Sequence, residues 1–193
     1  TPTINEKALV IYGKLQPKGK EVNITPSVNG VVDKIFVKEN EFIEKGKTIC
    51  TLKTTSQDGS FSLYSLDAPS DGIVYKLDLR EGEAFRFGDD NRVILGSPDL
   101  QVTADLEPFW IGSINANSRY SVYNSENDQL IGTAVYKSGS RYLRGKTVRS
   151  DAVDERLSTQ YQEVISTFSP AYKDLPIGLP VYVRITDMEK SAQ

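Results

Sequence analysis

The chain has 193 residues and a formal net charge of −3. This length fits one domain or two small ones, and the charge gives no support for binding to nucleic acid. The chain has no histidine, so the most common general base and metal ligand are missing. A single cysteine, Cys50, excludes an internal disulfide and a thiolate metal cluster. Within TICTL it is expected to be a small core residue.

Apolar residues recur with a period of two along almost the whole chain, which predicts short β-strands. Many short strands of this kind are typical of sandwiches and barrels, so the predicted fold class is all-β. The expected strands lie at 21–28, 30–37, 47–52, 72–79, 92–96, 100–106, 118–124, 129–137, 162–169 and 179–186.

Two segments are candidates for helix. Residues 150–160 follow a possible cap, Ser150 or Asp151, but their apolar spacing is thin, so a turn is an equal alternative. In 106–114, Pro108 is placed to start a single helical turn. No segment reaches the roughly 20 apolar residues that span a membrane.

The sequence contains an internal repeat: residues 26–47 resemble residues 68–89, which lie 42 positions later. In each copy a strand, a tight turn, a short strand and a glycine follow one another. Asn40 stands where the second copy has Gly82, and both residues tolerate a positive φ in a turn. Two such units related by a pseudo-twofold axis are expected to share one core, formed by Val32, Ile35, Val37, Val74, Leu77 and Leu79.

The two copies resemble the halves of a lipoyl/biotinyl-type β-sandwich. Their order, with a leading strand in 13–30 and a further β-domain ending in LPIGLPVYVRI (175–185), is similar to the periplasmic adaptor, or membrane fusion, proteins of the haemolysin-D type. The resemblance covers about residues 10–187. It implies a leading strand in 1–24 that joins a β-barrel, a lipoyl-like sandwich in 25–96 and the barrel itself in 97–193.

True lipoyl and biotinyl carriers present a modified lysine on the hairpin between the halves. Here that interval, 53–65, holds only Lys53, at the expected end of a strand and without the acidic or methionine neighbour of the carriers. A solvated strand-end charge is therefore favoured over a cofactor site, and no cofactor is expected.

Typical adaptors carry a long helical hairpin in the same interval. The dozen residues here hold the polar, turn-like TTSQDGS and have room only for a loop or a short β-hairpin. Contact with an outer-membrane channel is therefore not expected. Either the protein works without the helical hairpin, or the hairpin has been removed from this sequence.

The search for catalytic or metal sites gives only weak candidates. Asp89, Asp90 and the carboxylates of 154–163 are favoured as solvated turn residues over an acid pair or a cation site. The stretch 137–146 lacks the spacing of a phosphate loop and is expected to be a hairpin turn. We expect no catalytic, cofactor-binding or metal-binding residues and no enzymatic activity.

Two further groups of residues are candidates for docking. Trp110 with Phe109 is expected to pack under the barrel, with an interface anchor as the alternative. A basic run interleaved with Tyr136 and Tyr142 is favoured as a barrel face or a subunit docking surface over a nucleic-acid face; its members are Lys137, Arg141, Arg144, Lys146 and Arg149.

The resemblance implies an adaptor subunit of a bacterial envelope export or efflux system. The expected partners are an inner-membrane transporter, driven by ATP (ABC type) or by protons (RND type), and further copies of the chain, with no nucleic acid. The expected location is the periplasm or cell envelope, with a membrane anchor upstream of Thr1. The alternatives are a β-rich ligand-binding module of the envelope and a lipoyl/biotinyl-type carrier domain.

Overall fold

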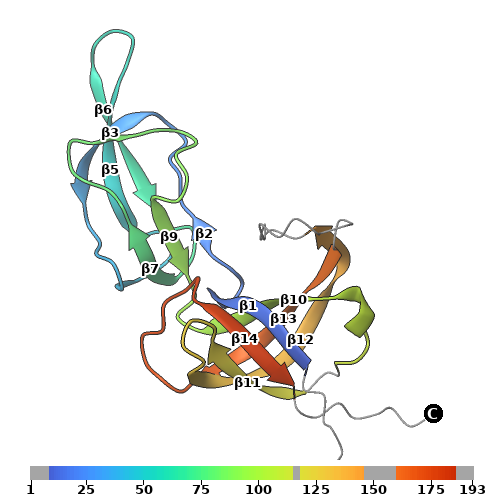
Figure 1. The fold of residues 1–193 in the computed structure, drawn as a ribbon. Coiled ribbons are helices and arrows are strands. Elements are labelled where there is room, and N and C mark those ends of the chain that lie inside the picture. The colour runs from blue at the N-terminus through green and yellow to red at the C-terminus, as the bar shows by residue number, and fades with distance from the viewer. Residues whose placement is uncertain (1–8, 115–117, 146–159, 186–193) are drawn as a thin grey trace, which may run out of the picture. The chain divides into compact units, whose positions relative to one another are not determined.

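The computed structural model describes residues 9–114, 118–145 and 160–185. Pro17–Asp99 forms one compact unit, and the described residues on either side of this segment form the other. Apart from one short 3-10 helix, the regular structure of the described residues consists of β-strands (Figure 1). The predicted all-β class, with a lipoyl-like sandwich and a β-barrel, is confirmed.

The sandwich consists of two four-stranded sheets, with strand orders β2–β9–β7–β4 and β6–β5–β3–β8. Each sheet has an antiparallel pair from one half of the repeat and a short strand from the other. The strands are β2 (Val22–Asn23), β3 (Gly30–Ile35), β4 (Phe42–Ile43), β5 (Thr48–Thr55), β6 (Phe61–Asp67), β7 (Gly72–Leu77), β8 (Ala84–Phe85) and β9 (Val93–Gly96).

The two halves exchange their short strands. Gly30 of β3 pairs with Phe85 of β8, and at the matching positions of the repeat Gly72 of β7 pairs with Ile43 of β4. The sequence repeat is therefore also a repeat in strand pairing. Because each short strand completes the other half's sheet, neither half can form its sheet alone.

The tight turns of the repeat have the predicted conformation. Asn40 has φ 68° and Gly82 has φ 84°. The N–H of Asn40 donates to the carbonyl of Val74 at 2.7 Å, and the N–H of Gly82 donates to the carbonyl of Val32 at 2.8 Å. Each turn is thus tied to the central strand of the other half.

The shared core of the sandwich is confirmed, with one adjustment. Of the six predicted core residues, Ile35 and Leu77 are half-buried against the core and the other four are buried. The pairing register shifts after Val32 and after Val74, so the strict alternation breaks at the same place in both halves. The buried residues are Ile24, Val32, Val37, Ile43, Ile49, Cys50, Leu52, Leu66, Ala68, Val74, Leu79, Phe85, Val93 and Leu95.

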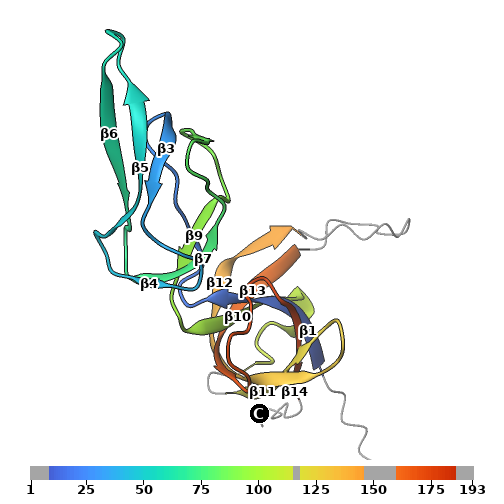
Figure 2. The ribbon, with the colours of Figure 1, turned by 90° about the vertical axis from the view of Figure 1, so that its left-hand side faces the viewer.

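The second unit is a closed barrel with the strand order β1–β10–β13–β12–β11–β14. Figure 2 shows these strands arranged around a ring. Closure leaves no free edge, because the first strand pairs with the last. The elements are β1 (Leu9–Pro17), β10 (Leu100–Leu106), η1 (Pro108–Trp110), β11 (Arg119–Asn124), β12 (Leu130–Gly145), β13 (Gln160–Pro170) and β14 (Pro180–Ile185).

The leading strand is shorter than expected. It was predicted to join the barrel up to residue 24, but β1 ends at Pro17. Gly19 and Lys20 follow with positive φ, and the N–H of Lys20 donates to the carbonyl of Pro17 at 2.8 Å, which makes a tight turn. After this turn β2 pairs with β9 in the sandwich.

The local predictions outside the repeat have mixed outcomes. The single helical turn at Pro108 is present as η1. The predicted hairpin turn at 137–146 is wrong, because residues up to Gly145 continue β12, with two register shifts against β13. The helix candidate at 150–160 lies outside the described residues.

The left-handed turn of the repeat predicts an asymmetry between two substitutions at Gly82. Gly82→Ala should lower the free energy of unfolding of the sandwich by about 1 kcal/mol, because a side chain at φ 84° is strained. Gly82→Asn should cost less, because Asn40 adopts the same conformation in the other half. Scanning calorimetry checks this, and equal losses for both variants would contradict it.

Candidate docking surfaces

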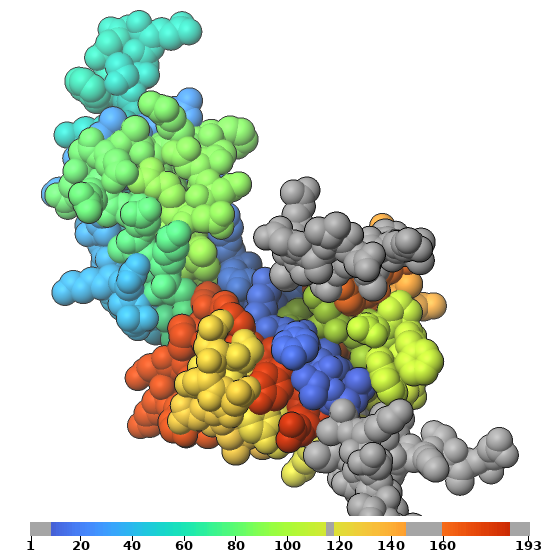
Figure 3. All heavy atoms as spheres, in the orientation of Figure 1, coloured from blue at the N-terminus to red at the C-terminus, as the bar shows by residue number. Residues whose placement is uncertain are grey.

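A short β-hairpin, one of the two predicted alternatives, occupies the interval between the two halves. We call residues 54–62 of β5 and β6 the hairpin arm. Its turn is closed by the N–H of Ser56, which donates to the carbonyl of Ser60 at 2.8 Å. The carboxylate of Asp58 accepts the N–H and the hydroxyl of Ser60, and these bonds lower the pKa of Asp58. The arm rises clear of the rest of the sandwich (Figure 3).

Lys53 lies within β5 rather than at the tip of the hairpin. It pairs with Leu63 of β6, and its Nζ is 3.2 Å from the Oδ1 of Asp33. An exposed ion pair of this kind contributes at most about 1 kcal/mol to stability. The position does not present a lysine to a modifying enzyme as the hairpin tip of a carrier does.

Large apolar side chains are exposed on the outer face of β6. Phe61 is 75% exposed and Leu63 is 64% exposed. The pairing of Leu63 with Lys53 and of Lys53 with Val31 places these side chains on one face of the sheet. Exposed apolar residues grouped in this way mark interaction surfaces.

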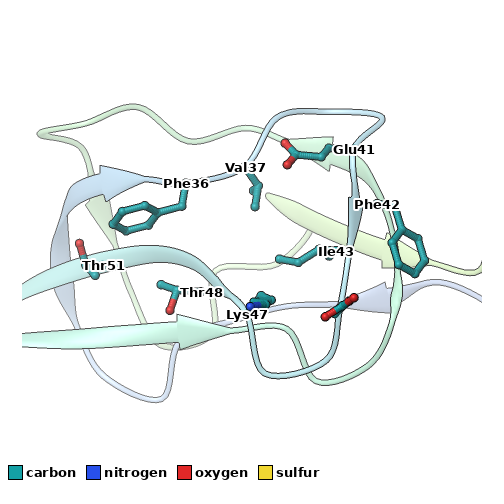
Figure 4. A pocket seen from close by; sticks show the side chains of 9 residues that line it. Phe36, Val37, Glu41, Phe42, Ile43, Lys47, Thr48 and Thr51 are labelled. Atoms are coloured by element: carbon teal, nitrogen blue, oxygen red, sulfur yellow. The ribbon is translucent and has the colours of Figure 1, made fainter.

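A hollow of about 730 Å³ lies beside the start of β5 (Figure 4). Phe36 and Phe42 at its wall are each 55% exposed. The hydroxyl of Thr51 is buried there without a hydrogen-bond partner among the described residues. The exposed aromatic rings at its wall make the hollow a candidate docking surface. It is lined by Phe36, Val37, Glu41, Phe42, Ile43, Glu44, Lys47, Thr48 and Thr51.

Cys50 is a core residue, as predicted. It is fully buried in the sandwich, and burial raises its pKa to about 11. At neutral pH the side chain is therefore a protonated thiol with little nucleophilic character.

Of the acidic residues at 89–90, Asp90 is exposed, and Asp89 belongs to a local network of contacts. Asp89 accepts the N–H of Arg86 and lies 3.7 Å from the guanidinium of Arg92. Arg92 also contacts Glu83 at 2.6 Å and lies over the ring of Phe85. Within the part of the chain that the structure describes, no group of three or more acidic or cysteine side chains could hold a metal ion.

The basic run lies partly in the second half of β12. Tyr142 is 74% exposed, and the guanidinium of Arg144 is 3.2 Å from the carboxylate of Glu163 on β13. Lys146 and Arg149 lie outside the described residues. The ion pair reduces the positive charge of this face, on which the aromatic ring of Tyr142 is exposed.

A row of three tyrosines crosses the outer face of the barrel and was missed by the sequence reasoning. Tyr12, Tyr182 and Tyr123 occupy paired positions on β1, β14 and β11. The rings of Tyr123 and Tyr182 stack with centroids 5.1 Å apart, and the Tyr182 hydroxyl donates to Asp128 at 3.0 Å. The only sign of this row in the sequence is a tyrosine at an outward position of each of the three strands. That the tyrosines are neighbours follows only from the pairing register of the strands.

The side chains of Phe109 and Trp110 differ in burial. Trp110 is half-buried and packs against the barrel core, as predicted, whereas Phe109 is 81% exposed. The two rings meet edge to face with centroids 4.9 Å apart. Phe109 is therefore the available anchor, and Trp110 supports it.

The burial of Cys50 predicts low reactivity of its thiol. In the folded protein at pH 8 the thiol should not react with a maleimide on the timescale of minutes, because both burial and a pKa of about 11 oppose attack. In denaturant it should react fully. Mass spectrometry after labelling measures both, and rapid labelling of the folded chain would contradict the assignment.

The aromatic pair predicts effects of different size for two alanine substitutions. Trp110→Ala should lower the free energy of unfolding of the barrel by about 2 kcal/mol, because it removes a half-buried ring. Phe109→Ala should change it by less than about 0.5 kcal/mol, because that ring is exposed. Circular dichroism during urea unfolding measures both; an equal loss would show that Phe109 is also a packing residue.

Comparison with known proteins shows similarity at the level of the fold. No protein-family model and no curated protein sequence matches the chain. Among solved structures, MacA from Actinobacillus actinomycetemcomitans matches with TM-score 0.65 and 13% identity, over 93% of this chain and 79% of that one. ZneB from Cupriavidus metallidurans matches with TM-score 0.57 and 12% identity, over 92% and 97%.

A third match comes from a protein described as a membrane fusion protein. Spr0693 from Streptococcus pneumoniae R6 has TM-score 0.56 and 12% identity, and the match covers 96% of this chain and 100% of that one. No helix among the described residues could cross a membrane. The split sandwich and the closed barrel of this chain together have the fold of the membrane fusion, or adaptor, proteins.

Proposed function

We propose that the chain is a non-enzymatic adaptor subunit of a bacterial envelope export or efflux system. The observation that carries this proposal is the shared fold over more than nine tenths of the chain, including a protein described as a membrane fusion protein. Sandwich and barrel occur here in the same single chain as in those proteins. The proposed location is the periplasm or cell envelope, with a membrane anchor upstream of Thr1.

The mechanism of such a subunit is assembly rather than chemistry. We place several copies on an inner-membrane transporter of the ABC or RND type, around the path of the substrate. The exposed aromatic residues support docking, because Tyr12, Phe109 and Tyr142 offer large contact area at low entropic cost. Nucleic acid is not a proposed partner.

The hairpin arm sets this chain apart from adaptors with a helical hairpin. A matching chimaera of MacA and MexA contains the α-hairpin domain of MexA from Pseudomonas aeruginosa. In this chain the arm has a turn of only five residues, Ser56–Ser60, between its strands. We therefore propose that the subunit works without direct contact with an outer-membrane channel.

The row of tyrosines favours a second candidate function. The exposed ring of Tyr12, beside the stacked rings of Tyr123 and Tyr182, suits the apolar face of a sugar or a peptide, so the second candidate is a ligand-binding module of the envelope. Saturable binding of such a ligand to the monomer, lost in Tyr12→Ala, would favour this candidate over the adaptor.

In-cell crosslinking of the full-length protein tests the adaptor function. A photo-crosslinking residue at Phe109 or Tyr142 should capture an inner-membrane transporter, which mass spectrometry identifies. The same residue at Thr133, exposed but outside the aromatic groups, is the matched control. Capture of soluble proteins only, from all three sites, would contradict the proposal.

A further inference from the structure

β6 forms the edge of its sheet, and half of its backbone groups point away from β5. The N–H of Ser56 donates to the carbonyl of Ser60, so these two residues are a hydrogen-bonded pair. In an antiparallel ladder only every second pair is hydrogen-bonded, so Ser62 and Tyr64 are the next residues of β6 whose backbone groups bond β5. The N–H and C=O groups of Phe61, Leu63 and Ser65 therefore point outward. Among the described residues no strand pairs with this side of β6.

This edge lacks the usual protection against pairing. The other three edge strands of the sandwich, β2, β4 and β8, have two residues each, whereas β6 has seven. Short edges, prolines, bulges and charges are the devices that block further pairing. From Phe61 to Leu66 the strand contains neither charge nor proline. The arm extends this open edge beyond the pairing of β5 with β3, which ends at Lys53.

We propose that β6 pairs antiparallel with β6 of a second copy, about a twofold axis at Leu63. In this register Leu63 lies opposite Leu63 of the second copy, and Phe61 lies opposite Ser65 in both directions. All three outward-pointing residues of the uncharged stretch then find backbone partners. Asp67 falls outside the paired stretch, so no charge is placed opposite an apolar side chain.

The outer face of the joined sheets supports the same register. Leu63 shares its row with Lys53, so pairing at Leu63 brings two leucines together between two lysines. Neighbouring strands are about 4.8 Å apart, which separates the lysines by about 14 Å, more than a Debye length at physiological salt. Each lysine is also beside its own Asp33. A second copy is the occupant because the edge is complementary to itself.

Engineered cysteines test the register in the full chain. Residues facing each other in a hydrogen-bonded antiparallel pair have Cα atoms about 5.5 Å apart, within the range of a disulfide. Under mild oxidation Leu63→Cys should form a covalent dimer, while the adjacent Ser62→Cys should not, because residue 62 lies opposite residue 64 of the second copy. Buried Cys50 does not compete. Equal crosslinking of both variants would overturn the register.

A proline at the outward position tests the edge itself. Leu63→Pro removes an outward N–H and leaves the bonds to β5 in place, the situation in which edge strands accept proline. It should weaken dimerisation at least about ten-fold in sedimentation, which corresponds to ~1.4 kcal/mol, while the matched Leu63→Ala retains the dimer. Circular dichroism reports whether each variant is folded.

Several results would overturn the pairing, and none of them depends on the adaptor function. A chain that stays monomeric up to about 1 mM, or a dimer that persists in folded Leu63→Pro, excludes β6 as the interface. If the chain stays monomeric but binds a synthetic peptide as an added strand, the partner of the β6 edge is a different protein. Transporter capture in cells is a separate measurement, so either idea can fail alone.

Discussion

The exchange of short strands between the two halves is the constraint on which the sandwich depends. The N–H of Val32 donates to the backbone carbonyl of Glu83, and the N–H of Val74 donates to the backbone carbonyl of Glu41. The central strand of each half therefore bonds the turn of the other half. The shared core is a consequence of this reciprocal bonding.

The two units handle strand edges differently, and this difference organises their surfaces. The barrel removes its edges by closure, so its surface offers side chains, among them the exposed rings of Tyr12 and Tyr142. The sandwich has four edges, and three are two residues long. Partner recognition through side chains therefore suits the barrel, whereas recognition through the backbone is possible on the sandwich at β6.

The sequence predicts features that rest on local chemistry. The repeat, the turn at Asn40 and Gly82, and the burial of Cys50 follow from residue type and spacing, and the structure has them. Features that depend on the pairing register of distant strands could not be predicted from the sequence. The alignment of Tyr12 with Tyr182 requires the pairing of β1 with β14, which are about 170 positions apart. The stretch at 137–146 was misjudged because its glycines and serines occur in the irregular pairing of a long strand.

The pairing of β1 with β14 also orders events during synthesis. Ribosomes add about 5–20 residues per second, so the sandwich, which ends at Asp99, is complete seconds before β14 emerges. Until then Leu9, Ile11 and the other inward-facing side chains of β1 have no barrel to enter. Non-local closure of this kind is slow. Among the described strands of the barrel, β1 is therefore the one whose apolar side chains wait longest for the barrel to close.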